Sequence, residues 1–152
     1  MMVRVCSRIR FNSAEGKRFP LTEPKARTVA MIGSGRLALP ALEPAVAVRP
    51  IERVLVYSRS AENREAFARR ASTNLKVDIV PAASAQQAID QADFVLVSTN
   101  SPAPAVHGEW LLPGQAIFGV GRPNEFNDDV YLHAGLITVT SKAHEREYYD
   151  RK

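Results

Sequence analysis

Short apolar runs alternate with helix-like segments along the chain from residue 28 onward. The first run, TVAMI at 28–32, is apolar throughout, as expected of a strand that is buried on both faces. Further strands are predicted by five later runs, at residues 53–58, 76–80, 94–99, 115–121 and 136–140. Strands that alternate with helices indicate a parallel sheet with right-handed connections. The pattern therefore predicts an α/β fold, with a doubly wound, mostly parallel sheet of about six strands and helices on both faces.

Two of the connecting helices carry start signals. Ser60 precedes AENREAFARRA and is predicted to cap it, with Glu62 in the first turn, where a negative charge suits the helix dipole. Ser84 and Gln87 have the spacing of a capping box ahead of AQQAIDQA. No helix pattern follows the fourth strand, where the proline-rich segment 100–114 stands instead. A connection of this length is expected to be functional or to carry a short turn of helix.

The charge composition is unusual mainly at the N-terminus. The chain has 152 residues, which suits one domain, and no apolar run approaches the roughly 20 residues that span a bilayer. The net charge of +4 is uneven, because residues 1–27 hold seven basic and two acidic residues. We predict a basic N-terminal arm at 1–27, disordered or misplaced, a main domain at 28–142, and a charged C-terminal helix or tail at 143–152. A solvated arm explains the charge more simply than nucleic-acid binding.

The cysteine and histidine content bears on the cellular location and on metal binding. The single cysteine, Cys6, cannot close an intrachain disulfide, which favours a reducing, cytoplasmic location. The three histidines stand in separate segments, so no metal site is predicted.

The strongest chemical signal is the glycine turn after the first strand. Residues 33–38, GSGRLA, fit G-x-G-x-x-G/A between a buried strand and a helix. Gly33 permits the tight turn, Gly35 lets the backbone approach a pyrophosphate, and Ala38 is small enough for the helix to pack on the sheet. The first N–H groups of that helix would point at the phosphates. The turn predicts a dinucleotide site in a Rossmann-type sheet; a glycine turn with only a structural role is the alternative.

Two prolines stand in the helix that should follow this turn. Pro40 and Pro44 each lack an N–H group, which costs about 3 kcal/mol in a helix interior. Helical spacing places both toward solvent. We expect a kinked or broken helix whose first turn survives, and a phosphate site needs only that first turn.

The end of the second strand bears on which cofactor binds. An NAD site usually has an acidic residue there for the ribose hydroxyls, whereas this chain has Tyr57, Ser58, Arg59 and Ser60. An arginine and two hydroxyls suit a 2′-phosphate, so NADP(H) is favoured over NAD(H). Alternatively, Arg59 is only a surface cation and Ser60 only a helix cap.

Three segments in consistent order resemble the ornithine cyclodeaminase/mu-crystallin family over about residues 28 to 142. They are VAMIGSGRLA, RPIERVLVYSRSAENREAFA and AIDQADFVLVSTNSPAPAVHGEWLLPGQAIFGVG, of which STNSPAPAVHGEWLLPG is the most specific part. The resemblance implies a Rossmann domain that binds NAD(P), which in the family is one half of a larger subunit. It also implies hydride transfer between nicotinamide and a small amino or imino acid.

By position, the resemblance places the cofactor contacts at the ends of four predicted strands. The residues are Gly33, Ser34, Gly35, Arg36, Leu37, Ala38, Ser58, Arg59, Ser60, Thr99, Asn100, Val120 and Gly121. The cyclodeaminases have an aspartate where this chain has Gly121, which argues against cyclodeamination more than against imine reduction.

No catalytic residue is predicted. The family's substrate-binding Arg and Lys belong to a half that residues 1–27 do not resemble, so this chain alone is expected to bind cofactor without turnover. A homo-oligomer is expected if a sheet edge or face is left exposed. The alternative is a freestanding nucleotide-binding or protein-interaction module without turnover.

Overall fold

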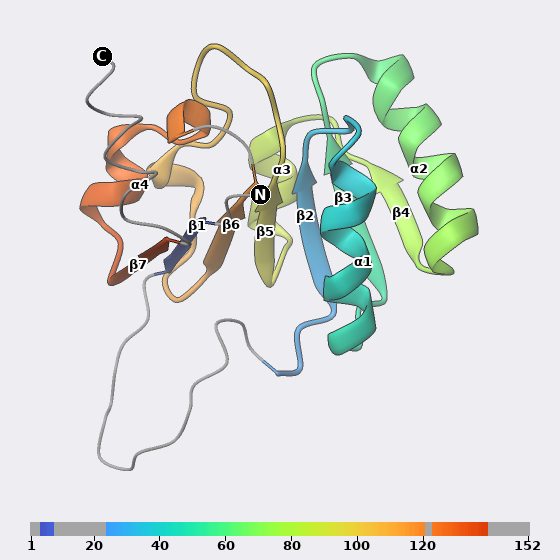
Figure 1. Ribbon diagram of the computed structural model, residues 1–152, viewed down its shortest axis with the longest axis horizontal. Coiled ribbons are helices and arrows are strands. Elements are labelled where there is room, and N and C mark those ends of the chain that lie inside the picture. Colours follow the sequence, from blue (N-terminus) through green and yellow to red (C-terminus); the bar gives the residue numbers. More distant parts are fainter. Residues whose placement is uncertain (1–3, 8–23, 121–122, 140–152) are drawn as a thin grey trace.

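One seven-stranded sheet forms the centre of the computed structural model, which describes residues 4–7, 24–120 and 123–139 (Figure 1). The strand order is β4-β3-β2-β5-β6-β1-β7. The strands are β1 (Arg4–Ser7), β2 (Thr28–Ile32), β3 (Arg53–Tyr57), β4 (Asp78–Pro81), β5 (Phe94–Val97), β6 (Ala116–Gly119) and β7 (Leu136–Val139). Five neighbouring strands, from β4 to β6, are parallel. The predicted Rossmann-type α/β fold is confirmed.

Helices cover both faces of the sheet (Figure 1). The α-helices are α1 (Ala38–Val48), α2 (Ala61–Leu75), α3 (Ala85–Asp90) and α4 (Asp128–Leu132). Two short 3₁₀ turns are η1 (Gly108–Trp110) and η2 (Pro123–Glu125). The first of these is the turn of helix expected within the long proline-rich connection. No helix in the described ranges is long and apolar enough to cross a membrane.

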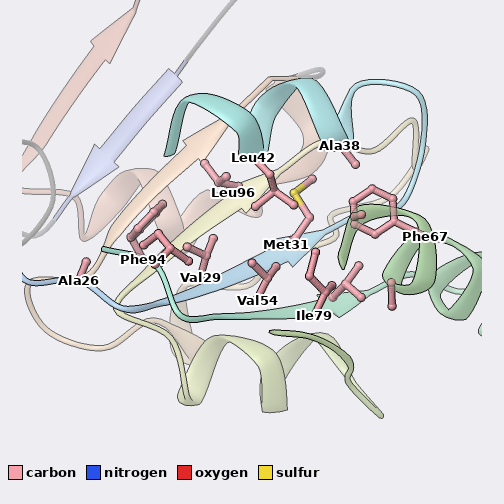
Figure 2. Close-up of a cluster of buried hydrophobic side chains, with 14 of the residues drawn as sticks. Ala26, Val29, Met31, Ala38, Leu42, Val54, Phe67, Ile79, Phe94 and Leu96 are labelled. Carbon is pink, nitrogen blue, oxygen red and sulfur yellow. The ribbon is translucent and has the colours of Figure 1, made fainter. Parts of the chain in front are cut away.

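The two faces of the sheet bury separate apolar clusters, because side chains alternate along each strand. Met31 of β2 packs with Leu42 of α1 and Phe67 of α2 on one face (Figure 2). Ile32, the next residue, packs on the other face with Ile89 of α3. A strand covered on both sides has no solvent-facing positions along its buried length, which explains why the four buried residues of β2, Val29 to Ile32, are all apolar.

The helix that contains both prolines is continuous from Ala38 to Val48, so of the two predicted outcomes, a kink or a break, the break does not occur. Pro40 is the third residue of α1, where the N–H groups have no intrahelical partner to lose. Pro44 lies inside the helix, and both prolines are exposed, as the spacing predicted. The packing of Leu42 against the sheet offsets the one hydrogen bond that Pro44 cannot donate.

The capping predictions are confirmed, and one helix is longer than predicted. Ser60 Oγ accepts a hydrogen bond from the Asn63 N–H group, and Ser84 Oγ accepts one from Gln87. The second helix continues to Leu75 and ends at Lys76, which adopts the left-handed conformation with φ 56°. Because Lys76 caps the longer helix, the next strand begins later than the predicted 76–80. This strand, β4, begins at Asp78 and has Pro81 as its last residue.

The sheet contains one strand that the pattern does not predict. Arg4–Ser7 forms β1, antiparallel to β6 on one side and to β7 on the other. The strand predicted at 136–140 is present as β7 at Leu136–Val139, but it pairs with β1 and not with β6. The four residues RVCS are too few to carry an alternating signal strong enough to predict a strand. The C-terminal helix or tail predicted at 143–152 lies outside the described residues.

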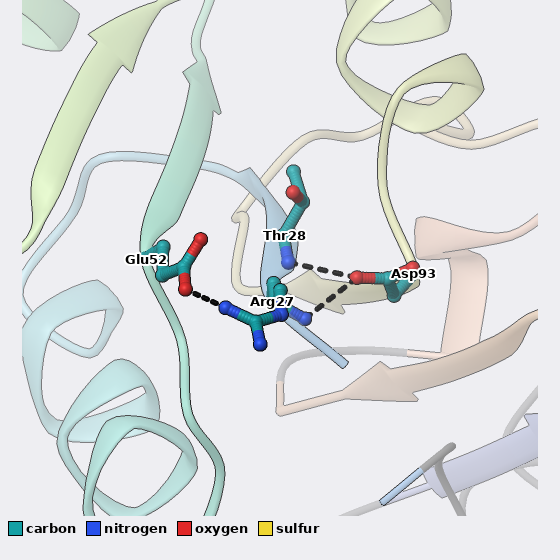
Figure 3. Close-up of polar contacts among 4 residues, drawn as sticks. All are labelled: Arg27, Thr28, Glu52 and Asp93. Carbon is teal, nitrogen blue, oxygen red and sulfur yellow. Dashed lines mark hydrogen bonds and ion pairs between the residues drawn. The ribbon is translucent and has the colours of Figure 1, made fainter. Parts of the chain in front are cut away.

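Asp93 anchors the start of the central strand. Its Oδ2 accepts hydrogen bonds from the backbone N–H groups of Arg27 at 2.7 Å and Thr28 at 2.8 Å (Figure 3). The Asp93 N–H group in turn donates to the Thr28 carbonyl. Arg27 also forms an ion pair with Glu52, but both side chains are more than half exposed, where such pairs contribute little. Asp93 therefore fixes β2 beside β5 at the amino-terminal edge of the sheet.

We expect Asp93→Ala to lower the free energy of unfolding by about 1 to 2 kcal/mol, because two backbone donors lose their acceptor. Urea unfolding of the two proteins measures this difference. Asp93→Asn is the matched control, since its amide oxygen can still accept, and it should lose less. An alanine variant with the wild-type urea midpoint would contradict this role.

Candidate functional site

The glycine turn connects β2 to α1 at the carboxyl-terminal edge of the sheet. Gly33 has φ +110°, and a Cβ atom at this position would lie 2.0 Å from the Ser98 carbonyl oxygen. Its N–H group donates to the Tyr57 carbonyl at 2.8 Å. The turn is thus packed between the ends of β3 and β5, and only glycine has both the conformation and the size for it.

The next part of the turn faces open space. A Cβ atom at Gly35 would meet no atom within 4 Å, and Gly35, Arg36 and Leu37 are exposed. Within the described residues, no hydrogen bond engages the backbone N–H groups of Ser34, Gly35, Arg36 and Leu37. Ala38 is fully buried and begins α1 against the sheet. The turn presents consecutive N–H donors and the start of a helix to solvent, an arrangement suited to an anion.

Hydroxyl groups connect this turn to the end of β3. Ser34 Oγ donates to Ser58 Oγ at 3.0 Å, and Ser58 Oγ donates to the Ser60 carbonyl at 3.0 Å. Arg64 Nη1 donates to the Ser58 carbonyl at 3.0 Å, and its guanidinium lies 5.7 Å from the centre of the Tyr57 ring. These contacts hold the segment after β3 beside the glycine turn.

Arg59 is exposed next to this hydroxyl network. No interaction of its side chain is present among the described residues. Ser60 is the cap of α2, and its hydroxyl oxygen accepts a hydrogen bond from the Asn63 N–H group. The segment offers one cation and no carboxylate at the position after β3.

The ends of β5 and β6 complete the same edge. Thr99 lies next to the glycine turn, since a Cβ atom at Gly33 would be 3.3 Å from its Cγ2. Asn100 is exposed, and Val120 donates its N–H group to the Val97 carbonyl at 2.8 Å. The structure therefore brings the predicted site residues together, except Gly121, which lies outside the described residues. Their role as cofactor contacts stays a prediction.

Two residues at this edge are missed by the sequence analysis. Glu125 is 1% exposed, and its Oε1 accepts a hydrogen bond from the Thr99 N–H group. Asn124 Nδ2 donates to the Ser101 and Pro102 carbonyls at 3.2 and 3.1 Å. In the polar run PNEFNDD, a glutamate is expected to lie at the surface. The feature of the sequence that could indicate its burial is the neighbouring Phe126, which is buried.

A separate hollow of about 410 Å³ lies between η1 and α4. It is lined by Gly108, Glu109, Leu111, Leu112, Gln115, Asp129, Val130, His133 and Ala134. None of the predicted cofactor residues lines it. In the described ranges, no group of three or more His, Cys, Asp or Glu side chains could bind a metal ion.

Comparison with known proteins identifies the lineage. The family model for the ornithine cyclodeaminase/mu-crystallin family matches residues 12–149. This chain belongs to that family. The resemblance predicted from the glycine turn and the long proline-rich connection is confirmed.

Among curated relatives, a Δ(1)-pyrroline-2-carboxylate reductase of Bacillus cereus is 35% identical over 126 residues. The match covers 80% of this chain and 38% of that protein. The ketimine reductase mu-crystallin of Macropus fuliginosus is 28% identical over 134 residues, covering 86% of this chain and 41% of the relative. The chain thus spans about two fifths of the length of these relatives.

Solved structures agree with the fold. The Δ(1)-pyrroline-2-carboxylate reductase of Thermococcus litoralis, in complex with NADH and L-proline, matches with a TM-score of 0.62 at 30% identity. The match covers 66% of this chain and 31% of that chain. An archaeal alanine dehydrogenase with bound NAD matches with a TM-score of 0.56 at 21% identity, covering 62% of this chain and 28% of that one, which supports the fold alone.

Proposed function

We propose that this chain binds a nicotinamide dinucleotide, NAD(P), across the carboxyl-terminal edge of its sheet. The observation that carries the proposal is the turn at Gly33–Ala38, where the N–H groups of residues 34–37 have no partner among the described residues and the space at Gly35 is open. The turn also lies where the strand order reverses, because β2 connects through α1 to β3 on one side and β5 lies on the other. Open α/β sheets bind ligands at this switch point.

The residues present fit the parts of such a cofactor. The N–H groups of residues 34–37 and the start of α1 suit the pyrophosphate, and Gly35 leaves room for it. The segment Ser58–Ser60 lies where the adenosine ribose belongs, after the second strand of the unit. Thr99, Asn100 and Val120 then border the nicotinamide half. When bound, the nicotinamide donates or accepts a hydride.

The chemistry of relatives suggests the class of reaction. Names such as Δ(1)-pyrroline-2-carboxylate reductase and ketimine reductase support an imino- or amino-acid oxidoreductase or cyclodeaminase lineage. We assign no described residue to the substrate, so we expect the chain alone to bind cofactor without turnover. Self-association and cytoplasmic location remain predictions.

Calorimetric titration with NADPH and NADH tests the proposal. We expect saturable binding of at least one of them, with one dinucleotide per chain. If neither binds at millimolar concentration, the proposed function is wrong. Robust reductase activity of the purified chain would instead overturn the expectation of binding without turnover.

We further propose a preference for NADP(H), based on Arg59 and the missing carboxylate after β3. We expect Arg59→Ala to weaken NADPH binding about tenfold and leave NADH binding unchanged, since a 2′-phosphate loses a charged partner. Parallel titrations measure both affinities. Arg69→Ala, at an exposed arginine in the middle of α2, is the control and should change neither. Equal losses for both cofactors in Arg59→Ala would contradict the preference.

A further inference from the structure

We propose that Asn124 and Glu125 are positioning residues, which hold the loop after β5 in the shape that receives the nicotinamide half of the cofactor. The loop, residues 99–106, is called the β5 loop below. The inference rests on the dinucleotide binding proposed above and adds two residues that would not touch the cofactor themselves.

The first contact lies at the start of the β5 loop. Glu125 is buried, and its carboxylate accepts the hydrogen bond from the Thr99 N–H group directly after β5. A Cβ atom added to Gly119, at the end of β6, would lie 3.6 Å from Glu125 Oε2. The carboxylate therefore lies between the ends of two neighbouring strands, beneath the edge where the cofactor is expected.

The remaining contacts follow the loop to its end. The Asn124 side chain donates to the carbonyls of Ser101 and Pro102. The Glu125 carbonyl accepts from the N–H groups of Ala105 and Val106, at 2.8 and 3.1 Å. Two consecutive residues thus bind the start, middle and end of the β5 loop.

This arrangement has a physical cause. A buried backbone N–H group without an acceptor is costly, and a buried carboxylate is stable only with donors. Glu125 Oε1 gives the Thr99 N–H group its acceptor, and Phe126 packs against Gly119, which brings Glu125 under the strand ends. The contact fixes the Thr99 backbone, which leaves Asn100 exposed at the cofactor edge.

The geometry also separates the two halves of the ligand. Ser58–Ser60 follows β3 on one side of β2, the glycine turn follows β2 itself, and the β5 loop begins on the other side. Loosening the β5 loop should therefore weaken the binding of the nicotinamide half of the cofactor and leave the binding of the adenosine half unchanged. A variant that simply misfolds would lose both.

The test is calorimetric titration of the full chain with ADP and with whichever of NADPH and NADH the wild type binds more tightly. We expect Glu125→Ala to weaken dinucleotide binding about tenfold with ADP binding unchanged. Glu125→Gln keeps an oxygen that can accept from Thr99, so its dinucleotide affinity should stay within about threefold of the wild type. Wild-type dinucleotide affinity in Glu125→Ala would overturn the inference.

Asn124→Ala keeps the inference testable if Glu125→Ala does not fold, as judged by loss of ADP binding. Asn124 is only partly buried. Removing its side chain should weaken dinucleotide binding severalfold and leave ADP binding unchanged. Equal affinities of Asn124→Ala and the wild type would then overturn the inference. A wild-type chain that binds no dinucleotide overturns the proposed function itself, and the inference with it.

Discussion

Gly33→Ala is expected to lower the free energy of unfolding by about 3 to 5 kcal/mol, a large part of the stability of a single domain. The new Cβ atom would lie 2.0 Å from the Ser98 carbonyl oxygen, so the turn or the end of β5 must move. The φ of +110° adds conformational strain for any residue with a side chain. Urea unfolding monitored by circular dichroism measures the loss.

Gly35→Ala is the matched control, because it makes the same substitution two residues away. Its Cβ atom would meet nothing within 4 Å, and Gly35 is not among the described glycines with positive φ. Its stability should stay within about 0.5 kcal/mol of the wild type. Equal stabilities of the two variants would show that Gly33 is not packed tightly against the Ser98 carbonyl.

Gly35→Val is expected to weaken dinucleotide binding by about 100-fold or more while the fold is retained. The larger side chain would occupy the space at the turn and hold the pyrophosphate away from the N–H groups of residues 34–37. Hydrogen bonds from those groups to a charged oxygen are among the stronger ones in proteins. Calorimetric titration measures the affinity, and unfolding in urea confirms that the variant is folded.

Gly35→Ala again serves as the comparison, with one added carbon and an intermediate loss of affinity. If Gly35→Val binds the dinucleotide as tightly as the wild type, the cofactor does not lie on this turn. We therefore expect the two glycines to differ, with substitutions at Gly33 lowering stability and substitutions at Gly35 lowering dinucleotide affinity.

The sequence predicts the parallel core of this fold because every signal there is local. The apolar run at β2 and the caps at Ser60 and Ser84 each specify their own element without help from distant residues. The glycine turn is equally local, since the turn and the first helical residues lie within six positions.

The features that were not predicted depend on contacts that are distant in the chain. Strand β1 is placed by pairing with β6 and β7, both more than 100 residues away, and its own sequence has no clear pattern. The burial of Glu125 follows from Thr99, 26 residues earlier, whose N–H group needs an acceptor. The helix tolerates Pro44 because Leu42 packs on the sheet. The helix sequence alone shows the hydrogen bond that Pro44 cannot donate, but it does not show this packing.

We propose that a dinucleotide lies on the turn Gly33–Ala38, and nuclear magnetic resonance of the ¹⁵N-labelled chain can locate it residue by residue. The backbone amide signals of Ser34, Gly35 and Arg36 should shift in a saturable way on titration with NADPH or NADH, because these N–H groups have no partner in the described part of the chain. Signals of the hollow between η1 and α4, such as that of His133, should stay in place. Saturable shifts confined to that hollow, or no shifts on the turn at saturating cofactor, would show that the dinucleotide does not lie on the glycine turn.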